Sequence, residues 1–328
     1  MNQTEQTARR VLAGHYRLHD AQLHLLHSTG GALKHVFQVA AGGATYVLKR
    51  YRPGYRPLQA VTNMHLAQVY LKKNGIPTPA VIPDTEGRLA LEFAGSCWVL
   101  YEWVPGRHYR QGELTARTAA ALGEMVGLVA RRLQPWPVPT WEGVEPFQAY
   151  PAEAQIAHYE RLLRHAERGS RPVDEQCRQV LRHKIGALER MSGWASRILG
   201  LPRQWVHGDV NDGNLFWAGD RITALIDFDN IRQAPRGFDF MYGLSACFLL
   251  DTPYRDDYAR AYIDVVRPSP AELEVYAPLW AYWEMSDIWP IDVLYLEPEA
   301  YDPAWRIDSP DSQRERRVPE LTEWLLRV

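Results

Sequence analysis

The fold is decided by two segments in which polar residues stand between short apolar runs: WVHGDVNDGNLF at residues 205–216 and ALIDFDN at residues 224–230. The apolar runs are typical of short strands, and the residues between them are typical of tight turns. Four residues separate the carboxylate of Asp209 from the carboxamide of Asn214, and the second segment adds the carboxylate of Asp227. We expect these three oxygen-bearing side chains to converge.

The three residue types match the needs of phosphoryl transfer. A hydroxyl that attacks the γ-phosphate of ATP needs a proton acceptor, and Asp209 suits this role. Asn214 and Asp227 suit Mg²⁺, which prefers oxygen ligands. Protein kinases space an Asp and an Asn in the same way, but Gly208 replaces their Arg and IDFD replaces their Asp-Phe-Gly. The alternative is a hairpin whose Asn, Asp and Gly residues only form the turn.

The first segment resembles the Brenner-type catalytic loop of the aminoglycoside phosphotransferase and choline kinase superfamily, with spore-coat kinase-like and homoserine kinase-like members nearest. Weaker matches extend the resemblance over roughly residues 20 to 250: YVLK at 46–49, NGIPTP at 74–79, LYEWVPG at 100–106 and GFDF at 237–240. The resemblance implies a protein-kinase-like fold and ATP-dependent phosphorylation of a hydroxyl on a small molecule, either a metabolite or an antibiotic-like compound.

The resemblance also assigns a lysine to the nucleotide. Lys49 lies near the end of the strand predicted for residues 44–51 and would hold the α- and β-phosphates. Position on a strand does not by itself distinguish Lys49 from its neighbours, so Arg50 and Arg52 stay open as alternatives.

Two backbone segments complete the predicted nucleotide site. The glycine pair Gly30 and Gly31 would let backbone amides approach phosphate oxygens, although a Gly-Gly hairpin turn without phosphate contact is an equal alternative. By resemblance, the backbone near Glu102 and Trp103 would pair with adenine.

One departure from the kinase pattern stands out. Kinase-like folds usually carry a Glu on the helix predicted for residues 58–73, where it orients the strand lysine, but residues 57–75 contain no Asp or Glu. Either another group holds Lys49, or the protein is a nucleotide-binding pseudokinase, a scaffold or a structural protein that keeps only the fold. A protein Ser/Thr kinase is a further alternative, although only twelve positions separate Asp227 from Asp239, too few for a long activation segment.

Strand and helix patterns predict an α+β, two-lobed architecture. Strands between Gln22 and Trp103 would form a five-stranded antiparallel sheet. Residues 1–104 would be the nucleotide-binding lobe and residues 105–328 a mainly helical lobe for catalysis and acceptor binding, joined through the breaker cluster VPGR at 104–107.

Composition limits the partners. The 328 residues include 37 Lys and Arg against 39 Asp and Glu, a net charge of −2, so nothing suggests a nucleic-acid or anionic-membrane surface. The N-terminal residues are polar and no apolar run approaches the ~18 residues of a membrane span, which makes the cytoplasm the expected location. The expected partner is a small molecule that carries a hydroxyl.

The region after residue 270 suggests one acceptor surface. On a helix, Glu284 and Asp287 would share a face with Trp280 and Trp283. Such an acidic and aromatic wall could receive a cationic acceptor. The alternative is an amphipathic helix with a solvated acidic side.

Overall fold

The computed structural model describes residues 3–28, 34–54, 56–110, 112–136, 152–301, 303, 307 and 314–328. The chain divides into two compact units. The first comprises Met1–Pro146, Trp205–Gln233 and Tyr242–Val266, and the second comprises Phe147–Gln204, Ala234–Met241 and Arg267–Val328. The first unit holds both polar segments of the predicted site together with Lys49.

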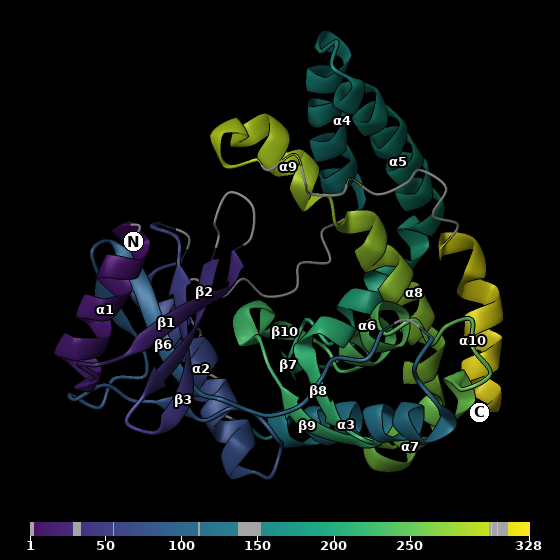
Figure 1. The fold of residues 1–328 in the computed structure, drawn as a ribbon. Helices are drawn as coiled ribbons and strands as arrows, with labels where there is room; N and C mark the ends of the chain where they lie inside the picture. The colour runs from purple at the N-terminus through teal and green to yellow at the C-terminus, as the bar shows by residue number, and fades with distance from the viewer. Residues whose placement is uncertain are drawn as a thin grey trace. The chain divides into compact units, whose positions relative to one another are not determined.

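An antiparallel sheet follows helix α1 (Gln3–Tyr16) in the first unit (Figure 1). Its strands are β1 (Gln22–Ser28), β2 (Lys34–Ala41), β3 (Ala44–Tyr51), β4 (Val81–Ile82), β5 (Leu91–Phe93) and β6 (Ser96–Glu102). The order is β1-β2-β3-β6-β4, and β5 also pairs with β6. The prediction of five strands is therefore wrong by one within the described residues. Two short strands pair with successive parts of β6, β5 with residues 96–98 and β4 with residues 100–101.

The two faces of this sheet have different covers. Leu48 packs in a cluster with Val11 and Leu12 of α1. Tyr51 packs in a second cluster with Val61 of helix α2 (Leu58–Lys73). Successive side chains of a strand point to opposite faces, so Lys49 lies on the face that carries Tyr51 and that α2 covers.

The segment of residues 203–235, which contains the predicted catalytic residues, folds as short strands and 3₁₀ turns. These are β7 (Arg203–Val206), η2 (Asp212–Asn214), β8 (Leu215–Ala218), β9 (Arg221–Leu225), η3 (Phe228–Asn230) and β10 (Arg232–Pro235). Strands β8 and β9 form an antiparallel hairpin in which Leu215 pairs with Leu225. The Ile226 N–H donates to the Asn214 carbonyl at 3.0 Å. The β8–β9 hairpin is therefore present, and it brings Asn214 beside the turn that contains Asp227.

Helices form most of the remaining described chain. Helices α3 (Ala116–Leu133) and α7 (Arg255–Val266) pack together in the first unit. Helix α6 (Gly237–Ala246) precedes α7, and its Tyr242 hydroxyl donates a hydrogen bond to Asp209. The second unit contains α4 (Ala152–Arg168), α5 (Pro172–Leu199), α8 (Pro270–Ser286), α9 (Trp289–Leu296), η4 (Pro298–Ala300), η5 (Arg314–Arg317) and α10 (Val318–Arg327). The predicted α+β class, with an N-terminal antiparallel sheet and a mainly helical remainder, is confirmed. The lobe boundary at residue 104 stays a prediction.

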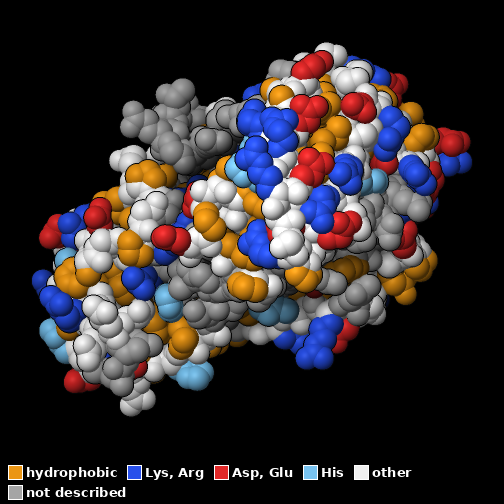
Figure 2. All heavy atoms as spheres, turned by 90° about the horizontal axis from the view of Figure 1, so that it is seen from above, with side chains coloured by type: hydrophobic (Ala, Val, Ile, Leu, Met, Phe, Trp, Pro, Cys, Tyr) orange, Lys and Arg blue, Asp and Glu red, His pale blue; other side chains and the backbone are white. Residues whose placement is uncertain are grey.

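Acidic and basic side chains both lie on the face of the molecule in Figure 2. Within the described ranges, no helix is both long and apolar enough to cross a membrane.

Candidate active site

The carboxylate of Asp209 accepts hydrogen bonds from four side-chain donors. Its Oδ1 accepts from Asn211 Nδ2 at 2.7 Å and from the Tyr242 hydroxyl at 3.0 Å. Its Oδ2 accepts from Asn214 Nδ2 and from Asn230 Nδ2, both at 3.1 Å. Four donors from the loop, from η3 and from α6 fix the plane of the carboxylate without adding a positive charge. An oriented, anionic oxygen pair of this kind is suited to accept a proton.

His207 is fully buried and uses both ring nitrogens within the turn. Nε2 lies 3.1 Å from the Ile226 carbonyl and must donate, because a carbonyl only accepts. Nδ1 then accepts from the Asp209 backbone N–H at 3.3 Å. The ring meets Phe228 edge-on at 4.6 Å. His207 therefore supports the loop, whereas Asp209 is half-buried and its carboxylate stays the predicted proton acceptor.

Gly208 explains why the Arg of protein kinases is absent here. Its φ is +81°, in the left-handed region, and a Cβ at this position would lie 2.1 Å from the backbone oxygen of Asn230. Any side chain would force the catalytic turn away from η3. Glycine is what allows Asn230 to reach Asp209.

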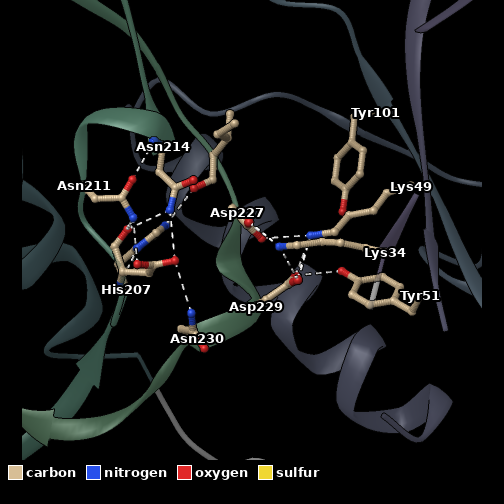
Figure 3. A network of polar contacts seen from close by, with 12 residues as sticks. Lys34, Lys49, Tyr51, Tyr101, His207, Asn211, Asn214, Asp227, Asp229 and Asn230 are labelled. Carbon is tan, nitrogen blue, oxygen red and sulfur yellow. Dashed lines mark hydrogen bonds and ion pairs between the residues drawn. The ribbon is translucent and has the colours of Figure 1, made fainter. Parts of the chain in front are cut away.

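A four-charge cluster forms where the sheet meets η3 (Figure 3). The Lys49 ammonium lies 2.8 Å from Asp227 Oδ1 and 2.8 Å from each oxygen of Asp229. The Lys34 ammonium lies 2.6 Å from Asp227 Oδ2 and 3.3 Å from Asp229 Oδ2. Two cations thus balance two anions. Asp227 itself has φ +65°, which is uncommon outside glycine and is a kind of strain that gathers at functional sites.

Electrostatics keep Lys49 and Asp229 of this cluster ionised. Burial would lower the pKa of Lys49, but the charges of Asp227 and Asp229 outweigh burial and hold that pKa above its usual value. Burial would raise the pKa of Asp229, but Lys49 and Lys34 hold that pKa well below its usual range. Both groups therefore carry full charge at neutral pH.

Lys34 and Tyr51 are site residues that the sequence prediction missed. The Tyr51 hydroxyl donates to Asp229 Oδ1 at 2.8 Å, and Lys34 is paired with Tyr51 in the register of β2 and β3. A Lys at the first position of the strand predicted after Gly30 and Gly31 was the available signal. Its target was not visible, because it lies 193 residues further along the chain.

The other predicted nucleotide contacts are placed as follows. Arg50 turns away from Asp227, since its Nε donates to Ser96 Oγ at 3.0 Å and its guanidinium lies over Trp98. The N–H of Glu102 donates to the Ala80 carbonyl at 2.9 Å, and that of Trp103 donates to the Thr45 carbonyl at 3.3 Å. An adenine contact through these N–H groups would have to displace those bonds, so it stays a prediction. Gly30 and Gly31 lie outside the described residues.

The donor set suits Mg²⁺ better than a metal that needs a protein cage. The described residues contain no group of three or more His, Cys, Asp or Glu that could hold an ion. Mg²⁺ commonly takes only one or two protein oxygens, with phosphates and water completing its shell. Asn214 turns its nitrogen to the Asp209 carbonyl and carboxylate at 2.9 and 3.1 Å, which leaves its oxygen as a possible ligand. Asp227 would supply the second.

The acidic and aromatic wall predicted in the second unit takes another form. Glu284 is ion-paired with Arg314, whose guanidinium lies 5.9 Å from the centre of the buried Trp280 ring. Trp283 packs edge-on against Phe238 at 5.2 Å. Asp287 follows the end of α8 as its C-cap. The Arg314 guanidinium therefore occupies the position expected for a cationic acceptor. The Glu284 side chain is only 12% exposed, so the alternative of a solvated acidic side does not hold for it either.

Comparison with known sequences gives one family and several relatives. Residues 27–278 match the model of the family described as "Phosphotransferase enzyme family". Homoserine kinase of Agrobacterium fabrum is 27% identical over 210 residues, which are 62% of this chain and 60% of that kinase. Homoserine kinase of Rhodopseudomonas palustris is 27% identical over 220 residues, which are 65% of this chain and 61% of that kinase. The chain thus spans about 60% of the length of these curated relatives.

Solved structures share the fold along nearly the whole chain. Amicoumacin kinase hAmiN, in complex with AMP-PNP, Ca²⁺ and Ami, has a TM-score of 0.63 at 14% identity and covers 100% of this chain and 94% of its own. The microcompartment-associated aminopropanol kinase has a TM-score of 0.55 at 15% identity, with coverage of 98% and 95%. At these identities the likeness is one of fold, and it confirms the predicted kinase-like fold.

Proposed function

Because the chain belongs to the phosphotransferase enzyme family, whose model spans residues 27–278, we propose that it transfers the γ-phosphoryl group of ATP to a hydroxyl of a small molecule. The observation that carries the proposal is the held carboxylate of Asp209 on the same pair of turns as Asp227, with Lys49 against Asp227. Base, metal ligand and phosphate-binding cation are the three parts that phosphoryl transfer needs from a protein.

In the proposed reaction, Asp209 accepts the proton of the acceptor hydroxyl as the oxygen attacks phosphorus. Asn211, Asn214, Asn230 and Tyr242 keep one carboxylate edge turned toward the acceptor throughout, because each oxygen is bound twice. Lys49 holds the α- and β-phosphates. Mg²⁺, held by Asp227 and Asn214, would neutralise phosphate charge when bound.

For the acceptor, we propose a small amino alcohol as the first class to test. The sequence relatives are homoserine kinases, and one structure of the same fold is an aminopropanol kinase. Antibiotic-like acceptors are the second class, since amicoumacin kinase shares the fold. The cytoplasmic location stays a prediction.

The test is ADP release in a coupled assay with Mg·ATP and a panel of amino alcohols, sugars, aminoglycosides and nucleoside-like alcohols. Product phosphate esters are identified by ³¹P NMR. Asp209→Asn is the control for contaminating kinases and for ATP hydrolysis. Thermal stabilisation by Mg·ATP without phosphoryl transfer to any acceptor would favour the pseudokinase alternative. Lack of nucleotide binding would favour a structural protein that keeps only the fold.

A further inference from the structure

Helix α2 covers the sheet face that carries Lys49 but offers it no negative charge. The buried His65 is a polar side chain of α2 that reaches the strands. Its Nδ1 donates to the Val61 carbonyl, and its Nε2 accepts from the hydroxyl of Tyr101 on β6. Burial lowers the pKa of His65 to about 4, so the ring is neutral at physiological pH. A neutral ring does not replace the carboxylate that usually orients a kinase lysine.

Asp229 of η3 supplies a carboxylate to Lys49. Both of its oxygens lie 2.8 Å from the Lys49 ammonium, a bidentate arrangement that fixes the ammonium in position more firmly than one contact can. The Tyr51 hydroxyl donates to Oδ1 at 2.8 Å and so fixes the carboxylate in turn. Lys49 and Tyr51 lie two residues apart on one face of β3, so the same strand presents both the lysine and the hydroxyl that binds Asp229.

The two acidic residues of IDFD have environments that suit different tasks. The Asp227 side chain is 21% exposed and opens the turn, whereas that of Asp229 is 6% exposed and lies inside η3. A metal ion with its water and phosphate ligands needs the accessible carboxylate. A permanent partner for a buried lysine is better placed on the enclosed one.

We propose that Asp229, fixed by the Tyr51 hydroxyl, is the positioning residue that holds Lys49 ready for the nucleotide phosphates, in the role that a helix carboxylate has in other kinase-like proteins. The proposal rests on the proposed function, because it takes Lys49 as the phosphate-binding cation. Asp227 is then free to leave Lys49 for the metal ion while Asp229 keeps the lysine in place. Asn230, the next residue, holds Asp209, so one turn of η3 positions both ends of the site.

The test is a double-mutant cycle on nucleotide affinity, measured by calorimetry without any acceptor. The variants are Asp229→Asn, Lys49→Met and the double variant, and the ligands are ADP with Mg²⁺ and, as the matched control, adenosine, which lacks phosphates. We expect Asp229→Asn to weaken ADP binding about tenfold and adenosine binding less than about twofold. In the Lys49→Met background, Asp229→Asn should change ADP binding less than about twofold, because residues that act through one another are not additive.

A milder variant keeps the test open if Asp229→Asn does not fold. Tyr51→Phe removes only the hydroxyl that fixes Asp229, and we expect it to weaken ADP binding by a few fold in the parent protein but not beside Lys49→Met. Equal loss of ADP and adenosine affinity, or losses that multiply in the double variants, would overturn the positioning role. If the parent binds ADP no better than adenosine, the proposed function fails first, and the positioning role fails with it.

Discussion

Replacing Asp209 by Asn removes the proton acceptor while keeping the size of the side chain. The four donors around Asp209 show what else the change costs. A carboxamide has one oxygen, so its NH₂ group must face either Asn211 and Tyr242 or Asn214 and Asn230. Facing the first pair is less costly, because the Tyr242 hydroxyl can rotate and accept, which leaves one donor unpaired. A single lost bond to a charged group costs about 1–3 kcal/mol of stability.

The catalytic loss should exceed the structural one. Removal of a well-placed base lowers kcat by about 10²–10⁴. ADP affinity should stay within about threefold, because Lys49, the lysine proposed to hold the phosphates, and the neighbouring Lys34 contact Asp227 and Asp229 and not Asp209. Steady-state kinetics on an accepted alcohol give kcat, and calorimetry gives ADP affinity. A kcat within tenfold of the parent value would refute the role of Asp209 as base. Parallel loss of ADP affinity would show instead that the variant disturbs the whole site.

Three further predictions follow from the same turns and from α2. Gly208→Ala places a Cβ 2.1 Å from the backbone oxygen of Asn230. We expect this variant to lower kcat at least tenfold and to lower the melting temperature by several degrees. Parent-like values of both kcat and melting temperature would contradict the close approach of the two turns. Tyr242→Phe removes one hydrogen-bond donor to Asp209 and should lower kcat by about three- to tenfold with ADP affinity unchanged. A fall in kcat as large as that caused by Asp209→Asn would argue that Tyr242 itself takes part in the transfer. Burial lowers the pKa of His65 to about 4 in the folded protein, whereas its pKa in the unfolded chain is near 6.5. The stability that the neutral ring contributes is therefore present above pH 6.5 and is lost as the pH falls toward 4. Between pH 7.5 and pH 5 the free energy of unfolding should fall by about 2 kcal/mol. Urea unfolding of the parent and of His65→Gln at the two pH values measures this loss, and an equal pH dependence in both proteins would show that His65 is not its source.

The sheet and the catalytic loop were predictable because their patterns are local. Alternation of apolar residues within 44–51 sets which side chains share a face, and the four residues between Asp209 and Asn214 fit a single turn whatever surrounds it. The number of strands was not local information. Strands β4 and β5 contain two and three residues, and only their pairing with β6 makes them part of the sheet.

The alternatives for the wall after residue 270 failed for a related reason. Helical spacing correctly placed Trp280, Trp283 and Glu284 on α8. The partner of Glu284 is Arg314, about thirty residues further on, and no periodicity relates the two. A pattern within one helix identifies a face but not what covers it.

By itself, the sequence determined the α+β class, the turn that carries Asp209 and Asn214, and the strand that carries Lys49, because short-range spacing and alternation fix which side chains a turn or strand presents. Only the tertiary structure decided that Lys34, Lys49 and Tyr51 meet Asp227 and Asp229. Those contacts join residues 178 to 195 positions apart. Charge balance in a buried cluster depends on which elements pack together, and no segment of the chain contains that information.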